Sequence, residues 1–187
     1  HLPAMKKMQQ LIRDGVIGDV IYARSDFGFV AKGARKARKF DSALAGGALL
    51  DIGIYNLAFM RMVMGYVNPV AFTSKHHINE YGTDDFSTIQ LEYPSDRTAT
   101  IVTCIGIDMP RHAAVYGTKG SILLEDFQIA AGLTVSVDGE EVQKLSFPIE
   151  MGGFEYEIRE ADRCIKAGLT SSDVVSPEES LALLDSM

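Results

Sequence analysis

The sequence predicts an α+β domain built around a large, mainly antiparallel, open-faced sheet with helices on one face. Between residues 69 and 147 the chain consists of short β-rich segments separated by turn signals such as "TKG" and "VDGE". Sequential strands joined by tight turns favour antiparallel pairing. Helical periodicity occupies both flanks of this region, and a helix with one apolar face has to bury that face against the sheet.

In the first third of the chain, segments with helical periodicity alternate with segments typical of strands. Residues 3–14 predict a helix, because a proline opens the segment and a glycine follows it. Residues 19–29 are β-branched and aromatic and predict a strand. Residues 31–45 are expected to form a loop that carries most of the basic side chains. Residues 47–64 predict a second helix, apolar nearly all round and therefore buried.

Several strands are then expected in succession. One of them, "TIVTCIGI" (100–107), is apolar at both alternating sets of positions. This pattern predicts that both faces of the sheet are covered and that the protein is an oligomer. The expected strands read "PVAFTSKHHI", "DFSTIQLEY", "RTATIVTCIGI", "HAAVYG", "SILLED", "LTVSVDG" and "EVQKLSF".

Two helices are expected at the end of the chain, both packed on the sheet. The first presents one apolar face, which includes Phe154, Ile158 and Ile165. The second opens with a capping box, in which the Ser176 hydroxyl caps the helix and Glu179 reaches back to the cap residue.

Composition and length describe a single globular domain over residues 1–187. The net charge of -7 argues against a nucleic-acid or anionic-membrane surface, and the short basic stretch 32–40 is expected to be a loop or a local anion site. The two cysteines form no CxxC pattern, which favours a reduced, cytoplasmic compartment and no metal site. No transmembrane segment or signal peptide is indicated. Because the chain starts at His1 and stops within a helical pattern, both ends are expected to be truncated.

One carboxylate and one phenol stand out inside the apolar segment "GGALLDIGIY" (46–55). Asp51 and Tyr55 lie four residues apart, so on a helix they share one face, about 6 Å apart along the axis. A phenol can move a proton while a carboxylate orients it or the substrate. In the structural alternative, Asp51 pairs with Arg35 or Arg38, and Tyr55 is a core aromatic residue.

The segment "GGALLDIGIYNLAFMRMVMG" resembles the signature helix of the Gfo/Idh/MocA family of nicotinamide-dependent oxidoreductases. Three more segments are similar to that family in the same order. "LPAMKKMQQLIRDGVIGDV" resembles the passage after the cofactor domain, "RHAAVYGTKGSILLED" the "GTKG" hairpin, and "GFEYEIREADRCIKAGLTSSDVVSPEESLALLDSM" the closing helices. The resemblance covers nearly the whole chain and implies the C-terminal, substrate-binding and dimerisation domain of a two-domain dehydrogenase.

This resemblance implies roles for particular residues. The family helix supplies an Asp and, four residues later, a His or Tyr that lines the substrate pocket, which match Asp51 and Tyr55. The aromatic residue relays the proton of the substrate hydroxyl while hydride passes to NAD(P)⁺. A Tyr at this position is similar to the glucose–fructose oxidoreductase and dihydrodiol dehydrogenase branches, which favours a sugar, polyol or cyclic diol substrate.

Two further residues are candidates for substrate binding. Arg38 precedes the signature helix, where it can hold a substrate hydroxyl or carboxylate, or simply be a solvated loop residue. Tyr156 lies in "GFEYEI", on a helix that the family places near the pocket, with helix packing as the alternative.

The sequence departs from the family pattern in one respect. It has no GxGxxG turn and no Glu-Lys-Pro motif, and its glycine clusters lack the spacing of a dinucleotide-binding turn. NAD or NADP is therefore expected in the full-length parent and not on this segment. A neighbouring lysine and the positive nicotinamide ring would favour a phenolate. This segment lacks both, so Tyr55 is expected to be idle here.

Two hypotheses follow. In the first, the chain is the catalytic half of a cytoplasmic dehydrogenase that works with its own N-terminal dinucleotide-binding domain and self-associates through the open sheet face. In the second, the chain is a binding or oligomerisation module that kept the fold and lost the chemistry. The presence of both Asp51 and Tyr55 favours the first hypothesis.

Overall fold

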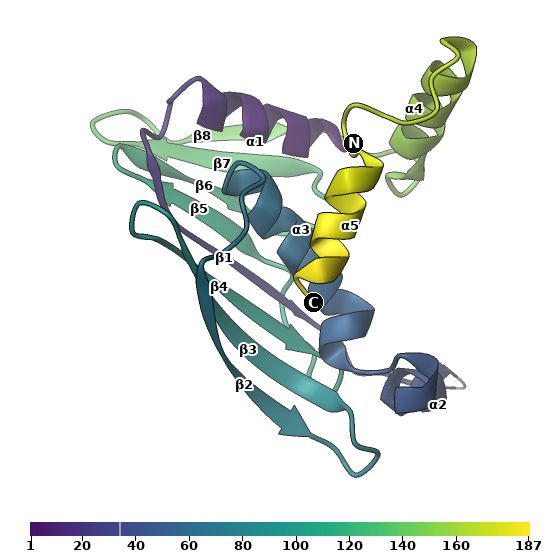
Figure 1. Cartoon of the computed structure of the whole chain (residues 1–187). Helices are drawn as coiled ribbons and strands as arrows, with labels where there is room; N and C mark the ends of the chain where they lie inside the picture. The colour runs from purple at the N-terminus through teal and green to yellow at the C-terminus, as the bar shows by residue number, and fades with distance from the viewer. Residues whose placement is uncertain (34) are drawn as a thin grey trace.

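A computed structural model describes residues 1–33 and 35–187, and in this part of the chain it shows one eight-stranded sheet with α1 and α3 against one face (Figure 1). In chain order the elements are α1 (Pro3–Arg13), β1 (Val20–Gly28), α2 (Arg35–Phe40), a 3₁₀ turn (Ser42–Leu44), a π-helical segment (Leu49–Gly53), α3 (Ile54–Val63), β2 (Ala71–Ile78), β3 (Asp84–Tyr93), β4 (Arg97–Cys104), β5 (Ala113–Gly117), β6 (Gly120–Leu124), β7 (Gly132–Val137), β8 (Gln143–Ser146), α4 (Phe154–Lys166) and α5 (Pro177–Asp185).

The strand order is β2-β3-β4-β1-β5-β6-β7-β8, so the first strand of the chain lies in the middle of the sheet. Strands β1 and β4 run parallel, and the other neighbouring pairs in the described sheet run antiparallel. The α+β class and the mainly antiparallel sheet are confirmed. Each strand expected from the sequence is present, with ends shifted by a few residues.

The stretch expected to be a loop, residues 31–45, contains two short helices instead. Helix α2 has the sequence "RKARKF", and Ala, Arg and Lys are good helix formers. The 3₁₀ turn that follows is capped by Asp41, whose carboxylate accepts a hydrogen bond of 2.9 Å from the backbone N–H of Ala43. The prediction was wrong because it read the basic charges as a loop signal and gave no weight to helix propensity.

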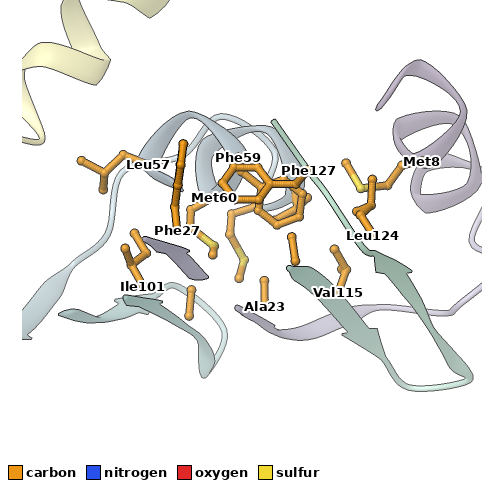
Figure 2. Close-up of a cluster of buried hydrophobic side chains, with 14 of the residues drawn as sticks. Met8, Ala23, Phe27, Leu57, Phe59, Met60, Ile101, Val115, Leu124 and Phe127 are labelled. Atoms are coloured by element: carbon orange, nitrogen blue, oxygen red, sulfur yellow. The ribbon is translucent and has the colours of Figure 1, made fainter. Parts of the chain in front are cut away.

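Helix α3 lies across the middle of the sheet and forms one wall of the core, as Figure 2 shows. Its Leu57, Phe59 and Met60 are buried, as are Ala23 and Val115 on the central strands beneath it. The nearly all-round apolar character of this helix is therefore explained by burial. By length and composition alone, the helical stretch Ser42–Val63 also meets the criterion for a membrane span. The core helix of a soluble protein passes the same test.

Helix α5 packs beside α3 (Figure 1). One of the two contacts of the predicted capping box is present at the start of this helix: the Ser176 hydroxyl accepts a hydrogen bond of 3.3 Å from the Glu179 N–H. The other predicted contact, from the Glu179 side chain back to the cap residue, is replaced by an ion pair. The Glu179 carboxylate forms an ion pair of 2.9 Å with Arg61, a buried side chain of α3. Since a buried guanidinium needs a partner, this ion pair takes precedence over the cap and links α5 to α3.

Helix α4 does not cover the sheet, contrary to the prediction. It stands apart from the sheet in Figure 1, and its apolar face is open, with Phe154 68% and Ile165 76% exposed. Only Glu155 and Cys164 of this helix are buried. The amphipathic pattern predicted the helix correctly but not its partner, since an apolar face specifies burial without specifying which surface supplies it.

The sheet face away from α3 carries side chains that alternate with the buried ones. On this face Tyr22 of β1 stacks on Tyr116 of β5, with 5.8 Å between ring centroids. Leu123 of β6 is exposed between the buried Ile122 and Leu124. On β4, Ala99 and Ile101 are buried and the alternate positions are half-buried. The second apolar set recognised in the sequence thus lies on a face that this single chain leaves open.

Candidate functional site

The site is built on the "GGALLDIGIY" segment, whose two leading glycines allow a close chain reversal. A side chain on Gly46 would place its Cβ 2.7 Å from the backbone N and O of Asp41. Gly47 has a φ of +124°, and a Cβ there would collide with the carboxylate of Asp84. L residues rarely adopt the φ of Gly47, and neither position leaves space for a Cβ, so both require glycine.

The helix expected over residues 47–64 begins as a π-helical segment and becomes regular only at α3. The Asp84 carboxylate accepts a hydrogen bond of 2.9 Å from the Leu49 N–H and so anchors the start of this segment. At its other end, a Cβ on Gly53 would lie 2.7 Å from Leu49 Cδ1 and 3.3 Å from Thr103 Cγ2. The chain accommodates an extra residue between these two fixed points, which is the usual form of a π-bulge at a functional site.

Asp51 lies within the π-helical segment, and its side chain is 9% exposed. Its Oδ1 forms an ion pair of 2.6 Å with Arg38, and its Oδ2 forms a shorter one with Lys39, both from α2. A buried carboxylate is costly unless it is paired, and the two cations meet that cost. The Arg38 pairing weighed as the structural alternative is present. The side chain of Arg35 lies outside the described residues.

Tyr55 is not a core residue, because 45% of its surface is exposed. Its ring packs on Phe27, with 5.8 Å between centroids. The ring centroid of Phe27 is also 6.4 Å from that of Phe29 and 6.1 Å from that of Phe127. The centroids of Phe59 and Phe127 are 5.5 Å apart. We call these five residues the aromatic cluster; Figure 2 shows Phe27, Phe59 and Phe127 meeting at α3. The cluster holds the Tyr55 ring from one side and leaves the other side open.

Two cations of this chain lie against the aromatic cluster. Lys39 Nζ is 4.6 Å from the centre of the Phe29 ring, and the Arg111 guanidinium is 5.8 Å from that of Phe27. Arg111 is held in place by a hydrogen bond of 2.9 Å to Gln128 and an ion pair of 3.3 Å with Asp126. From the sequence, Tyr55 was expected to lack a neighbouring lysine of this chain. Lys39 and Arg111 reach the rings of the aromatic cluster because α2 and the segment before β5 fold back, which local sequence does not show.

A cavity of about 400 Å³ opens beside Tyr55. Its walls come from α1, α3, the segment after β6 and the start of α4; they include Met62, Gln128, Phe154 and Glu157. Tyr156, the other predicted substrate contact on α4, packs beneath Arg159, whose guanidinium is 5.8 Å from the ring centre. The structure therefore pairs Asp51 with Arg38, places Tyr55 at a cavity and leaves Tyr156 against its own helix.

The described residues offer no cradle for a dinucleotide. The parallel neighbour of β1 is β4, which the chain reaches only through β2 and β3, so the direct strand–glycine turn–helix–strand unit is not formed by these strands. Within residues 1–33 and 35–187, no three His, Cys, Asp or Glu side chains are grouped so as to hold a metal ion. The described residues present a phenol at a cavity and a carboxylate held by two cations.

Residues 5–123 match the model of the GFO/IDH/MocA C-terminal domain, which is well over half of the chain. The chain belongs to the GFO/IDH/MocA family. Curated relatives include the trans-1,2-dihydrobenzene-1,2-diol dehydrogenases of Homo sapiens, 32% identical over 98% of this chain, and of Mus musculus, 31% identical over 98%. In both comparisons the chain spans 56% of the relative's length, about half of those enzymes.

Solved structures agree with this family assignment. The aldose-aldose oxidoreductase from Caulobacter crescentus, complexed with glycerol, matches 99% of the chain with a TM-score of 0.81 and 25% identity, and 58% of that protein is covered. A 3-ketoreductase from Actinomadura kijaniata, in complex with TDP-benzene and NADP, matches all of the chain with a TM-score of 0.77 at 18% identity, with 57% of that chain covered. The second likeness supports the fold alone.

Proposed function

We propose that this segment is the substrate-binding and catalytic half of an NAD(P)-dependent oxidoreductase that acts on a hydroxyl of a sugar, polyol or cyclic diol. The observation that carries the proposal is the Tyr55 phenol, half exposed at a cavity and four residues after the ion-paired Asp51. The names of the diol dehydrogenase and aldose oxidoreductase relatives support the class of substrate. The buried free cysteines fit a cytoplasmic enzyme.

Each residue has a defined part in this proposal. In the full-length parent, NAD(P)⁺ on the dinucleotide-binding domain would supply the acceptor for the hydride of the carbinol carbon. Tyr55 relays the proton of the substrate hydroxyl to water, and a carbonyl forms. Lys39 and Arg111 lie against Phe29 and Phe27, the rings that hold Tyr55 in place. Asp51 orients the substrate oxygen, since Arg38 and Lys39 fix its own position.

Arg38 and Tyr156 are proposed as substrate contacts. A guanidinium has five N–H donors, so Arg38 can bind a substrate oxygen while it holds Asp51. The phenol of Tyr156 lies between Phe154 and Glu157 in sequence, and both of these line the cavity.

The test uses the full-length protein that contains this segment. We expect it to bind NADH or NADPH in a fluorescence titration, whereas residues 1–187 alone do not. Tyr55→Phe should lower kcat on accepted diols or sugars by about 10²-fold or more without weakening nucleotide binding, because the proton acceptor is lost. Tyr22→Phe is the matched control, since that tyrosine lies on the opposite sheet face. Unchanged kcat in Tyr55→Phe would contradict the role given to this phenol.

One observation favours the non-catalytic alternative, a binding or oligomerisation module: both oxygens of Asp51 are already occupied by Arg38 and Lys39. If neither the full-length protein nor the segment binds a nucleotide, this ion-paired cluster is structural and the module is the better description. Nucleotide binding by the isolated segment would instead overturn the division of labour between the two halves.

A further inference from the structure

The cavity beside Tyr55 is lined mainly by apolar side chains, and few groups on its walls can form hydrogen bonds. Among the described residues, the polar side chains that line it are those of His1, Tyr55, Gln128 and Glu157. Gln128 is half-buried and lies in the segment between β6 and β7. Since a small-molecule site obtains its specificity from a few polar groups in fixed positions, the contacts that hold Gln128 bear on what the cavity binds.

Asp126 fixes the backbone of Gln128. Its Oδ1 accepts hydrogen bonds of 3.1 Å from the backbone N–H groups of both Gln128 and Ile129. Phe127, the residue between Asp126 and Gln128, donates its backbone N–H to the Arg111 carbonyl at 2.9 Å and buries its ring in the aromatic cluster. The Gln128 side chain therefore starts from a fixed point on the cavity wall.

Arg111 fixes the orientation of the Gln128 amide. Its Nη1 donates a hydrogen bond of 2.9 Å to Gln128 Oε1. A guanidinium has donors only, so the amide oxygen has to face it and the amide nitrogen has to face away. The guanidinium is restrained in turn by its ion pair of 3.3 Å with Asp126 and by the Phe27 ring, 5.8 Å away. The two ends of the amide are therefore not interchangeable.

The amide nitrogen of Gln128 has two N–H donors, and within residues 1–33 and 35–187 no acceptor takes either of them. Because Gln128 lines the cavity, these donors are available to a molecule bound there. An N–H group can only donate, so the complementary group is an oxygen that accepts, such as that of a hydroxyl. The fixed amide thus provides a second polar contact in the cavity that Tyr55 borders.

From this arrangement we propose that Gln128 recognises a second oxygen of the substrate, so that the preferred substrate is a neutral compound with at least two hydroxyls. Tyr55 meets the hydroxyl that reacts, and the Gln128 amide donates to another. Arg111 acts through Gln128 and is a positioning residue. The inference rests on the proposed function for the reacting hydroxyl, but the contact with Gln128 is a separate property that can be measured without turnover.

The kinetic test uses the full-length protein with NAD(P)⁺ and three probes: cyclohexanol, trans-1,2-cyclohexanediol and D-glucose. The value of kcat/KM for the diol or the sugar should exceed that for cyclohexanol about tenfold, as one neutral hydrogen bond predicts. The difference should lie in KM more than in kcat, because Gln128 binds an oxygen that does not change during the reaction. Equal kcat/KM for the three probes would overturn the inference.

Two variants separate recognition of the substrate from a structural role. Gln128→Leu removes the amide and should abolish the preference by raising KM for the diol and the sugar. Gln128→Glu keeps an oxygen that accepts from Arg111 but has no N–H donor, so it should abolish the preference as well. If Gln128 only holds Arg111 in place, Gln128→Glu keeps the wild-type preference and the inference fails. Gln143→Glu, the same change on the exposed strand β8, is the control and should have little effect.

A spectroscopic measurement separates this inference from the proposed function. The ¹H–¹⁵N signals of the Gln128 side-chain amide, identified by their absence in Gln128→Glu, should shift when the diol or the sugar is added to the full-length protein. If they shift but no alcohol is oxidised, the inference stands and the proposed function fails. If neither probe shifts them, the inference fails, and oxidation of the same probes with NAD(P)⁺ would leave the oxidoreductase standing.

Discussion

Asn56 is a polar side chain in a wholly buried position, directly after Tyr55. Its amide donates hydrogen bonds to the Ser25 backbone oxygen at 3.1 Å and to the Ser25 hydroxyl at 2.8 Å. These bonds tie the first turn of α3 to the central strand and thereby fix the backbone that carries the phenol. The buried Asn56 therefore holds the exposed Tyr55 in position through the backbone.

We expect Asn56→Leu to lower the free energy of unfolding by about 2 kcal/mol, because the Ser25 groups lose their donor without gaining water. Urea denaturation measures the change. Combined with Ser25→Ala, the two effects should be less than additive, as expected for residues in contact. Strict additivity would show that the two side chains do not act together.

Tyr93 provides a pH-dependent test of burial. Burial raises the pKa of its phenol from 10.0 to about 12, although Arg61 and Arg97 act in the opposite direction. The unfolded chain therefore releases this proton at lower pH than the native chain does. Native stability should decline between pH 10 and 12, in addition to the decline caused by other groups.

Urea unfolding of wild type and Tyr93→Phe over that range isolates the effect. The difference in stability between the two proteins should shift in favour of Tyr93→Phe as the pH rises from 10 to 12. A difference that stays constant with pH would mean that the phenol titrates equally in both states.

Among the secondary-structure elements, the start of the segment 46–55 depends on the backbone conformation of one glycine, Gly47. We expect Gly47→Ala to destabilise the fold by more than 2 kcal/mol, because the methyl group adds a collision with Asp84 to an unfavourable φ. The collision also displaces the carboxylate that anchors Leu49.

Gly65→Ala is the matched control for this prediction. Gly65 also has a positive φ, +81°, but a Cβ there would have no neighbour within 4 Å. It should cost only about 1 kcal/mol, the penalty of the backbone alone. Similar losses in the two variants, compared by thermal unfolding, would remove the collision with Asp84 from the explanation.

The elements show where local sequence is sufficient and where it is not. Helix α1 and strand β1 were predictable because proline, glycine and apolar periodicity act within a few residues. The pairing of Asp51 with Arg38 was foreseen as an alternative, since both residues are close in the chain. The π-helical turn was not predictable, because it depends on Asp84 and Thr103, which reach the segment from β3 and β4.

For the whole molecule, the open sheet face is the surface through which we propose that two copies associate. Leu123 and the Tyr22–Tyr116 pair give it apolar contact area. Arg24 and Asp26 follow Tyr22 at alternate positions of β1 and so share its face. A two-fold axis near β1 would bring opposite charges of the two copies together. Sequence alternation predicted this second face, but it could not show what covers it.

Sedimentation of the full-length protein should show a dimer at micromolar concentration, and Leu123→Glu should weaken the dimer by at least tenfold, since it places a charge in an apolar contact. Phe72→Glu is the control. That residue is even more open to solvent, 68% against 41% for Leu123, but it pairs with the buried Leu91 and so lies on the helix side of the sheet. A monomer at high micromolar concentration would end this proposal.

The central place of β1 also determines how the chain can fold. Strands β2 to β4 form one series of neighbouring antiparallel pairs, β5 to β8 form another, and the two series meet only through β1. Each series can assemble from local contacts, whereas the β1–β4 pairing closes a long loop and is slow to form. We therefore expect the insertion of β1 between β4 and β5 to be the slow step in forming this sheet. During synthesis, that strand has to wait for β4 and β5 to emerge before it can find either neighbour.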